Sequence, residues 1–205
     1  MSCISCKRNI ESYYKLLCIS CWAEIKFIFQ KDIDEQHAVV EYNNIMKKLI
    51  HNFKYKSPWM LCDLFVNWIS LLYNKLIVEI DVIIPVPIHR YKVMKRGYNQ
   101  SVVLSRKLAK KYGKKCLLEA LLKTHQTKSQ SSLNSDERRT NVIDSFAVNE
   151  KSIHFLNGKK ILLVDDVITT GSTLLECKRS LNQSGILQVQ TLCIAITKYE
   201  SSVDS

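Results

Sequence analysis

The sequence lacks an uninterrupted apolar run that is long enough to cross a membrane. Its most apolar window, residues 60–73, is broken by Asp63, Asn67 and Ser70, and a spanning helix needs about 20 apolar residues. The first residues also lack a basic stretch followed by an apolar core, so no signal peptide is expected. These absences predict a cytoplasmic protein without a membrane span.

The chain also lacks internal repeats and low-complexity tracts. Its 205 residues are 46% hydrophobic, which suffices for one well-buried α/β domain with an appendage of about 25 to 40 residues. We expect a cysteine-rich module over residues 1–24 and an α/β domain over 25–198. Within that domain, residues 25–80 form a mostly helical lead-in, and the polar tail over 199–205 is predicted to be disordered.

Acidic residues are scarce in one long stretch of the chain. Residues 82–135 hold 12 Lys and Arg residues but one acid, Glu119, and the remaining residues carry equal numbers of both signs. The formal net charge of +11 therefore belongs to this stretch. A localised positive charge favours the binding of a polyanion, whereas a solvated Lys-rich surface is the alternative interpretation.

Apolar periodicity predicts alternating helices and strands. Residues 43–55 read as an amphipathic helix, and Ser57-Pro58 can begin a second one. Further elements are strands over 81–85, 160–164 and 189–196, and helices over 99–112, ended by Gly113, and over 172–182. Strand, helix and strand in this order predict a right-handed βαβ unit in a doubly wound α/β sheet.

The most informative segment is residues 161–173, Ile-Leu-Leu-Val-Asp-Asp-Val-Ile-Thr-Thr-Gly-Ser-Thr. Its apolar half predicts a buried strand, and Asp165 and Asp166 follow where that strand emerges. Two carboxylates there are costly without a partner, but they can accept hydrogen bonds from ribose hydroxyls or help to position Mg²⁺. A small, hydroxylated turn with Gly171 then opens a helix, whose free N–H groups favour phosphate. The segment predicts a ribose phosphate site.

This segment resembles the signature of the type I phosphoribosyltransferases, which bind 5-phosphoribosyl-1-pyrophosphate with Mg²⁺. The resemblance implies that Asp165 and Asp166 hold the ribose hydroxyls. It also implies that the 5′-phosphate lies in a cradle formed by Thr169, Thr170, Gly171, Ser172 and Thr173.

Two CxxC pairs lie at the start of the chain, Cys3-x-x-Cys6 and Cys18-x-x-Cys21. Four thiolates at this spacing can close a tetrahedral zinc site. About 24 residues bury too little surface to fold alone, so metal binding would supply the folding energy. A redox pair and unligated thiols are the alternatives. The other four cysteines share no spacing pattern.

The basic stretch contains several polar motifs. Pro85-Val86-Pro87-Ile88-His89-Arg90 follows the first strand of the domain, and a proline-fixed turn there can present N–H groups to pyrophosphate. Arg90, Lys95 and Arg96 can neutralise that group. Asn99 suits a helix cap and a ligand contact equally. A later patch consists of Thr127-Lys128-Ser129-Gln130, Leu133, Arg138-Arg139, Asn141 and Phe146.

A charged helix face lies within the same stretch. Its members are Arg106, Lys107, Lys110 and Lys111, extended by Lys114 and Lys115. Such a face is usually solvated surface, but it can also follow a nucleic-acid backbone.

The order of these motifs, together with the cysteine module, resembles the ComF family of competence-associated, phosphoribosyltransferase-like proteins. The resemblance implies a type I phosphoribosyltransferase-like sheet with structural zinc, and a phosphoribosyl pyrophosphate site that includes Pro87, Arg90 and Arg96. It also implies binding of single-stranded DNA during natural transformation, with a competence helicase as partner. Lys123 departs from the family, which often has Arg near this place, and lysine lacks the planar fork of arginine.

Two other functions stay open at this point. An active phosphoribosyltransferase of nucleotide salvage would use Arg90, Lys95, Arg96, Lys123 and Lys128 to stabilise the leaving pyrophosphate, although no base-binding segment is recognisable. A sugar-phosphate-sensing interaction protein, without DNA binding or catalysis, is the third reading.

Overall fold

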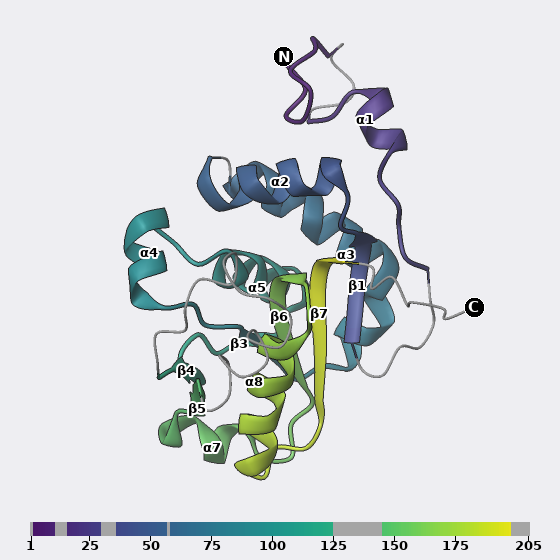
Figure 1. The fold of residues 1–205 in the computed structure, drawn as a ribbon. Helices are drawn as coiled ribbons and strands as arrows, with labels where there is room; N and C mark the ends of the chain where they lie inside the picture. Colours follow the sequence, from purple (N-terminus) through teal and green to yellow (C-terminus); the bar gives the residue numbers. More distant parts are fainter. Residues whose placement is uncertain (1, 11–15, 30–35, 57, 125–144, 198–205) are drawn as a thin grey trace, which may run out of the picture.

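The computed structural model describes the whole chain except residues 1, 11–15, 30–35, 57, 125–144 and 198–205. Its centre is a five-stranded sheet in which every neighbouring pair is parallel (Figure 1). The strand order is β1 (Gln36–Glu41), β7 (Val189–Ile196), β6 (Ile161–Ile168), β2 (Val82–Pro85) and β3 (Lys115–Cys116). The expected parallel α/β sheet is confirmed.

Helices cover both faces of this sheet, because its central strands are apolar on both sides. One face packs against α2 (Asn44–Tyr55), α3 (Pro58–Glu79) and α5 (Gln100–Tyr112). The other face packs against α8 (Ser172–Gln183) and a small antiparallel sheet of β4 (Leu121–Lys123) and β5 (Phe146–Val148). α7 (Glu150–Leu156) lies beside that small sheet (Figure 1).

Caps fix the helix ends that the sequence predicted. The Asn43 side chain accepts a hydrogen bond from the Met46 N–H (3.0 Å), and α2 begins there. Asn99 caps α5 by accepting from the Ser101 N–H (3.0 Å), while its own amide donates to the Val86 carbonyl (3.0 Å). Asn99 is therefore a helix cap that also ties the turn after β2 to α5. Ser57, the other predicted cap, lies outside the described residues.

The prediction that residues 25–80 form a mostly helical lead-in was only partly right. Residues 36–41 form β1, an edge strand of the main sheet that pairs with β7. The segment Gln-His-Ala-Val-Val-Glu is too short to show a strand period clearly. Its β-conformation depends on the free edge of β7, a partner about 150 residues later in the chain.

The turn after β2 also contains a helix that the sequence did not indicate. α4 (Arg90–Arg96) begins at His89, whose ring nitrogen accepts from the Tyr91 N–H (3.2 Å), and it ends at Gly97 in a left-handed conformation (φ 82°). The helix has no buried residue. Its short polar sequence therefore gave no apolar stripe from which to predict it.

One helix among the described residues, α3, has the length and composition of a membrane span. Seven of its residues lie in the core, and it packs against α2 and α5. A core helix meets the same criteria as a membrane span, so α3 is weak evidence for a membrane.

Candidate functional site

The acidic pair lies where two neighbouring strands part. β2 pairs with β6 only as far as Pro85, opposite Val164, whereas β7 continues along β6 to Ile168. β2 ends there because the chain turns through Val86-Pro87, and proline has no N–H for the sheet. Strand β6 therefore continues beyond the predicted 160–164. Asp165 and Asp166 are part of the strand, on a stretch whose β2 side is open.

The turn after β6 places small polar groups beside these acids. Gly171 adopts a left-handed conformation (φ 75°) and precedes α8 directly. The hydroxyl oxygens of Thr170 and Ser172 lie 2.7 Å apart and share a hydrogen bond. Residues 165–174 all line one pocket, so the predicted cradle Thr169, Thr170, Gly171, Ser172 and Thr173 opens onto the same space as both acids.

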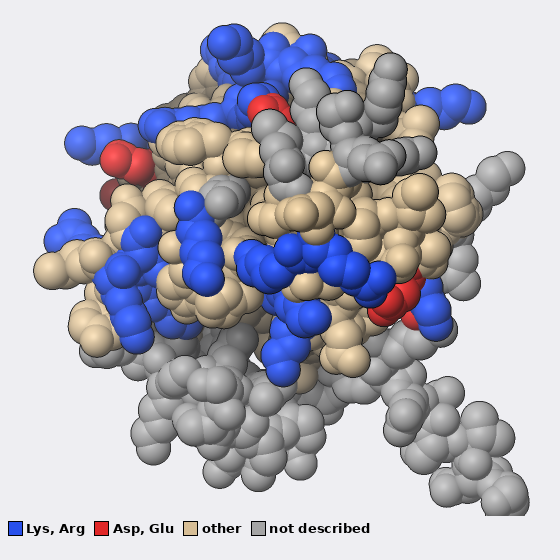
Figure 2. Space-filling view, turned by 90° about the horizontal axis from the view of Figure 1, so that it is seen from above, with Lys and Arg blue, Asp and Glu red and all other residues tan. Residues whose placement is uncertain are grey.

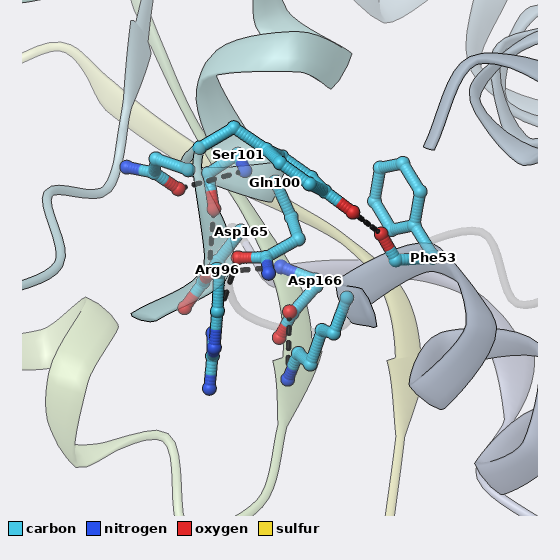
Figure 3. Close-up of polar contacts among 9 residues, drawn as sticks. Phe53, Arg96, Gln100, Ser101, Asp165 and Asp166 are labelled. Atoms are coloured by element: carbon cyan, nitrogen blue, oxygen red, sulfur yellow. Dashed lines mark hydrogen bonds and ion pairs between the residues drawn. The ribbon is translucent and has the colours of Figure 1, made fainter. Parts of the chain in front are cut away.

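The two carboxylates have different partners (Figure 3). Asp165 Oδ1 accepts hydrogen bonds from the Ser101 hydroxyl (2.9 Å) and the Asp166 N–H (2.9 Å). Asp166 Oδ2 forms an ion pair with Lys54 Nζ at 2.7 Å. Burial, and then the charge of Asp166, raise the pKa of Asp165 to about 7. Asp165 is therefore poised between its acid and carboxylate forms near neutral pH.

Four cations face this pocket. Lys54, Lys92, Arg96 and Lys123 all line it. Burial, followed by repulsion from neighbouring cations, lowers the pKa of Lys92 and of Lys123. Burial alone would also lower the pKa of Lys54, but the Asp166 carboxylate raises it. Clustered, partly desolvated cations of this kind favour a multiply charged anion.

The structure brings most of the predicted residues together. Pro87 and Arg96 line the pocket with the acids and the turn, whereas Arg90 is exposed at the start of α4 and does not line it. Lys95 is exposed on α4 as well, because the helix directs these side chains outward. Lys128 and the rest of the predicted patch up to Asn141 lie outside the described residues.

Three pocket residues were missed by sequence reasoning. Lys54 comes from α2, where it lies off the apolar stripe and resembles a surface lysine, and Lys92 comes from the unpredicted helix α4. Gln100 is 1% exposed, and its Nε2 has no hydrogen-bond partner among the described residues. Its Oε1 accepts from Arg96 Nη1 (3.3 Å), and Figure 3 shows both side chains beside the acidic pair. A buried amide nitrogen normally has a hydrogen-bond partner, so Gln100 is a candidate ligand contact in this pocket.

The four N-terminal cysteines converge on one point. Their Sγ atoms all lie within 4.8 Å of one another, and those of Cys6 and Cys18 are 3.6 Å apart. Zn–S bonds of about 2.3 Å in a tetrahedron place sulfur atoms about 3.8 Å apart, so the cluster fits a metal ion of this kind. Burial opposes ionisation of Cys3, but N–H groups of neighbouring residues lower its pKa to about 6, whereas burial raises the pKa of Cys21 to about 12.

The cysteine module is packed onto the domain through aromatic rings. Trp22, on the short helix α1 (Ile19–Ala23), meets Trp68 of α3 edge-on, with ring centroids 5.5 Å apart. Phe27 contacts both rings. Figure 1 shows the module at the end of the molecule next to α2.

Comparison with known proteins identifies the domain family of this chain. Residues 93–203 match the phosphoribosyl transferase domain. Among solved structures, the purine phosphoribosyltransferase of Pyrococcus horikoshii Ot3 aligns over 83% of this chain and 84% of its own, at 15% identity and a TM-score of 0.44. The domain match covers more than half of the chain, so the protein belongs to the phosphoribosyl transferase domain family.

Curated relatives identify a smaller family within the phosphoribosyltransferase-like proteins. Competence protein F of Haemophilus influenzae is 27% identical over 94% of this chain and 89% of its own length. Competence protein ComFC of Streptococcus pneumoniae is 30% identical over 77% of this chain and 66% of its own. DNA utilization protein YhgH of Escherichia coli O157:H7 is 29% identical over 78% and 71%. Within the phosphoribosyltransferase-like proteins, the chain is a member of the ComF family.

Proposed function

We propose that this protein binds phosphoribosyl pyrophosphate with Mg²⁺ and handles single-stranded DNA in the cytoplasm during natural transformation. The binding of phosphoribosyl pyrophosphate is supported by one observation: two acids, a hydroxylated turn and four cations line the same pocket. Asp165 and Asp166 would hold the ribose hydroxyls and help to position Mg²⁺. Residues from Thr169 to Thr173 would hold the 5′-phosphate at the start of α8.

The pyrophosphate group would occupy the other side of the pocket. Arg96 and Lys92 of α4, Lys123 of β4 and the turn at Pro87 line the pocket and would hold that group. Gln100 would donate its free amide hydrogens to the same ligand, since Nε2 has no partner among the described residues. The pocket thus offers donors for both phosphate ends and acceptors for the sugar between them.

The DNA part of the proposal is supported by charge and by relatives. The net charge of +11 is concentrated in residues 82–135, and DNA affinity arises largely from contacts between cations and phosphates. Competence protein F, competence protein ComFC and DNA utilization protein YhgH are similar to this chain over most of its length. A structural zinc ion at Cys3, Cys6, Cys18 and Cys21 completes the proposal, and a competence helicase is its predicted partner.

Calorimetric titration with Mg²⁺ and phosphoribosyl pyrophosphate tests the pocket. The double substitution Asp165→Asn, Asp166→Asn should weaken binding at least tenfold, because it removes both charged acceptors. Asp63→Asn, Asp81→Asn is a matched control outside the pocket and should bind like the wild type. Affinity should rise between pH 6 and pH 8, since Asp165 ionises through its pKa of about 7. A wild-type protein without measurable affinity contradicts the proposal.

An active phosphoribosyltransferase is the second candidate function. It is favoured by the cations Lys92, Arg96 and Lys123, which line the pocket and can stabilise charge on a leaving pyrophosphate. Release of pyrophosphate in the presence of a panel of nucleobases, absent in the Asp165→Asn, Asp166→Asn variant, would establish it. Ligand binding without release for any base leaves the binding function alone.

A further inference from the structure

A basic and aromatic surface lies on the outer faces of α2 and α4, next to the pocket. We name it the α2–α4 surface, and its exposed members are Lys47, Lys48, His51, Tyr55, Lys56, Tyr91 and Lys95. Neither helix contains an acidic residue. Figure 2, which views the molecule from the side of the cysteine module, shows many Lys and Arg side chains and few acids over this face. The field of this surface therefore attracts anions.

The cations of this surface are available to a partner. Lys47, Lys48, Lys56 and Lys95 form no ion pair with any residue that the structure describes. The inner side of α2 is fixed by five buried residues, so these lysines extend from a rigid element. Contacts with phosphates would replace only water and counterions.

The charged face of α5, which the sequence indicated for DNA, differs in this respect. Lys107 pairs with Asp63, and Lys111 donates to the Asn67 side chain (3.3 Å). Lys114 donates to the Val78 carbonyl (2.6 Å), and Lys115 lies over the Phe155 ring at 4.2 Å. Four of the six cations of this face, two on α5 and two just after it, therefore already have partners within the protein, and their contact with DNA would replace those interactions.

Aromatic side chains alternate with the cations on the α2–α4 surface. Tyr55 is 46% exposed and Tyr91 59% exposed. The His51 and Tyr55 rings lie 5.0 Å apart, and the Arg96 guanidinium lies 5.2 Å above the Tyr55 ring. Exposed rings held beside cations can stack on unpaired bases. Bases in a duplex are already stacked and offer no such face.

The surface leads directly to the pocket. Arg96 contacts Tyr55 on the outside and Gln100 on the pocket side. Lys54, one residue before Tyr55, forms the ion pair with Asp166. An extended strand on the α2–α4 surface would therefore end beside the sugar-phosphate site.

We infer that the α2–α4 surface binds single-stranded nucleic acid, with its lysines on the phosphates and Tyr55 stacked on a base. The inference rests on the proposed DNA function and names the surface that carries it. An anionic membrane is the less suitable partner, because the apolar side of α2 is buried in the core and cannot enter a bilayer.

Fluorescence anisotropy with a labelled single-stranded oligonucleotide tests the inference on the full-length protein. Lys47→Glu, Lys48→Glu should weaken binding about tenfold or more and reduce the salt dependence of the affinity. Arg106→Glu, Lys110→Glu, on the exposed face of α5, is the matched control and should change affinity less than about twofold. Tyr55→Ala should weaken binding about fivefold or more, whereas Tyr55→Phe should bind like the wild type.

The outcomes separate this inference from the proposed function. If the α5 variant loses affinity and the α2 variant does not, the proposed DNA binding is supported, but its assignment to the α2–α4 surface is contradicted. If the wild type binds no single strand even at low salt, both the inference about the surface and the proposed DNA function are wrong. The titration with phosphoribosyl pyrophosphate then still tests the pocket independently. The inference is also overturned if the protein binds vesicles of anionic lipid more tightly than the oligonucleotide. Equal affinity for RNA of the same sequence supports the surface and identifies its ligand as single strands in general.

Discussion

At the scale of single residues, Lys54 decides the electrostatics of the candidate site. Asp165 and Asp166 are adjacent and mostly buried, and without a counter-charge they would repel each other. Lys54 Nζ lies 2.7 Å from Asp166, with side-chain exposures of 23% and 12%. The cation is contributed by a helix more than 100 residues away in the chain, so the protein itself supplies a counter-charge to the acidic pair. A bound Mg²⁺ would take over part of this role.

Removing this cation should destabilise the fold. Lys54→Met leaves Asp166 unpaired, and we expect a loss of about 1 to 3 kcal/mol in the free energy of unfolding at pH 8. Asp165 has a pKa of about 7, so it is a neutral acid at pH 5 and charged at pH 8. The loss should therefore be larger at pH 8 than at pH 5. Urea denaturation at both pH values measures it.

Lys54→Arg is the control for this substitution, since it keeps the charge and should retain most of the stability. Equal losses for the Met variant at pH 5 and pH 8 would show that Lys54 does not interact with the charge of Asp165.

At the scale of elements, the cysteine module depends on the domain as well as on its own thiols. Cys3, Leu17, Cys21 and Ile25 belong to the same apolar cluster as the core of α2 and α3. Trp22 joins the module to α3 through Trp68. The module thus has the cluster of four cysteines at one end and ring packing against α3 at the other.

Loss of the thiols should release the metal and this docking together. The wild type should contain about one zinc ion per chain, measured by elemental mass spectrometry, and Cys3→Ser, Cys6→Ser should contain almost none. Tryptophan fluorescence of the variant should shift to the red as Trp22 leaves Trp68. Cys62→Ser, Cys116→Ser removes two thiols outside the cluster and should keep its zinc. A Cys3→Ser, Cys6→Ser variant that keeps both its metal and its fold contradicts the zinc site.

At the scale of the whole molecule, α2 connects the pocket with the proposed DNA surface. Lys54, near its C-terminal end, forms the ion pair with Asp166, and its outer face carries Lys47 and Lys48. The Tyr98 hydroxyl, from the segment before α5, donates to the Phe53 carbonyl on the same helix (Figure 3). A ligand in the pocket therefore changes the surroundings of the helix that would hold the strand.

This arrangement predicts negative coupling between the two ligands. Phosphoribosyl pyrophosphate adds negative charge beside Arg96, so saturating ligand with Mg²⁺ should weaken single-strand binding about fivefold, which corresponds to about 1 kcal/mol. Anisotropy at constant ionic strength measures this effect, and the Asp165→Asn, Asp166→Asn variant should not show it. By linkage, the oligonucleotide should weaken ligand binding by the same factor. An unchanged DNA affinity at verified ligand saturation would mean that the sites are independent.

The sequence by itself determined the parallel α/β class, the elements α2, β2, α5, α8 and β7, the first half of β6, and the convergence of four cysteines, whereas β3, β4, β5 and α7 were not predicted. The predicted features follow from local information: apolar runs, the caps Asn99 and Gly113, and the spacing of Cys3, Cys6, Cys18 and Cys21. The strand and turn over 161–173 also indicated a ribose phosphate site, because its acids and hydroxyls are neighbours in the chain.

Only the tertiary structure decided which distant residues complete that site. Gln36–Glu41 becomes a strand because β7 has a free edge, and α4 forms as a polar surface helix without an apolar stripe. Lys54 and Gln100 enter the pocket from two different helices, while Arg90 is directed away from it. A sequence pattern records which face of a helix is apolar, but the partner of its polar face depends on how the helices pack on the sheet.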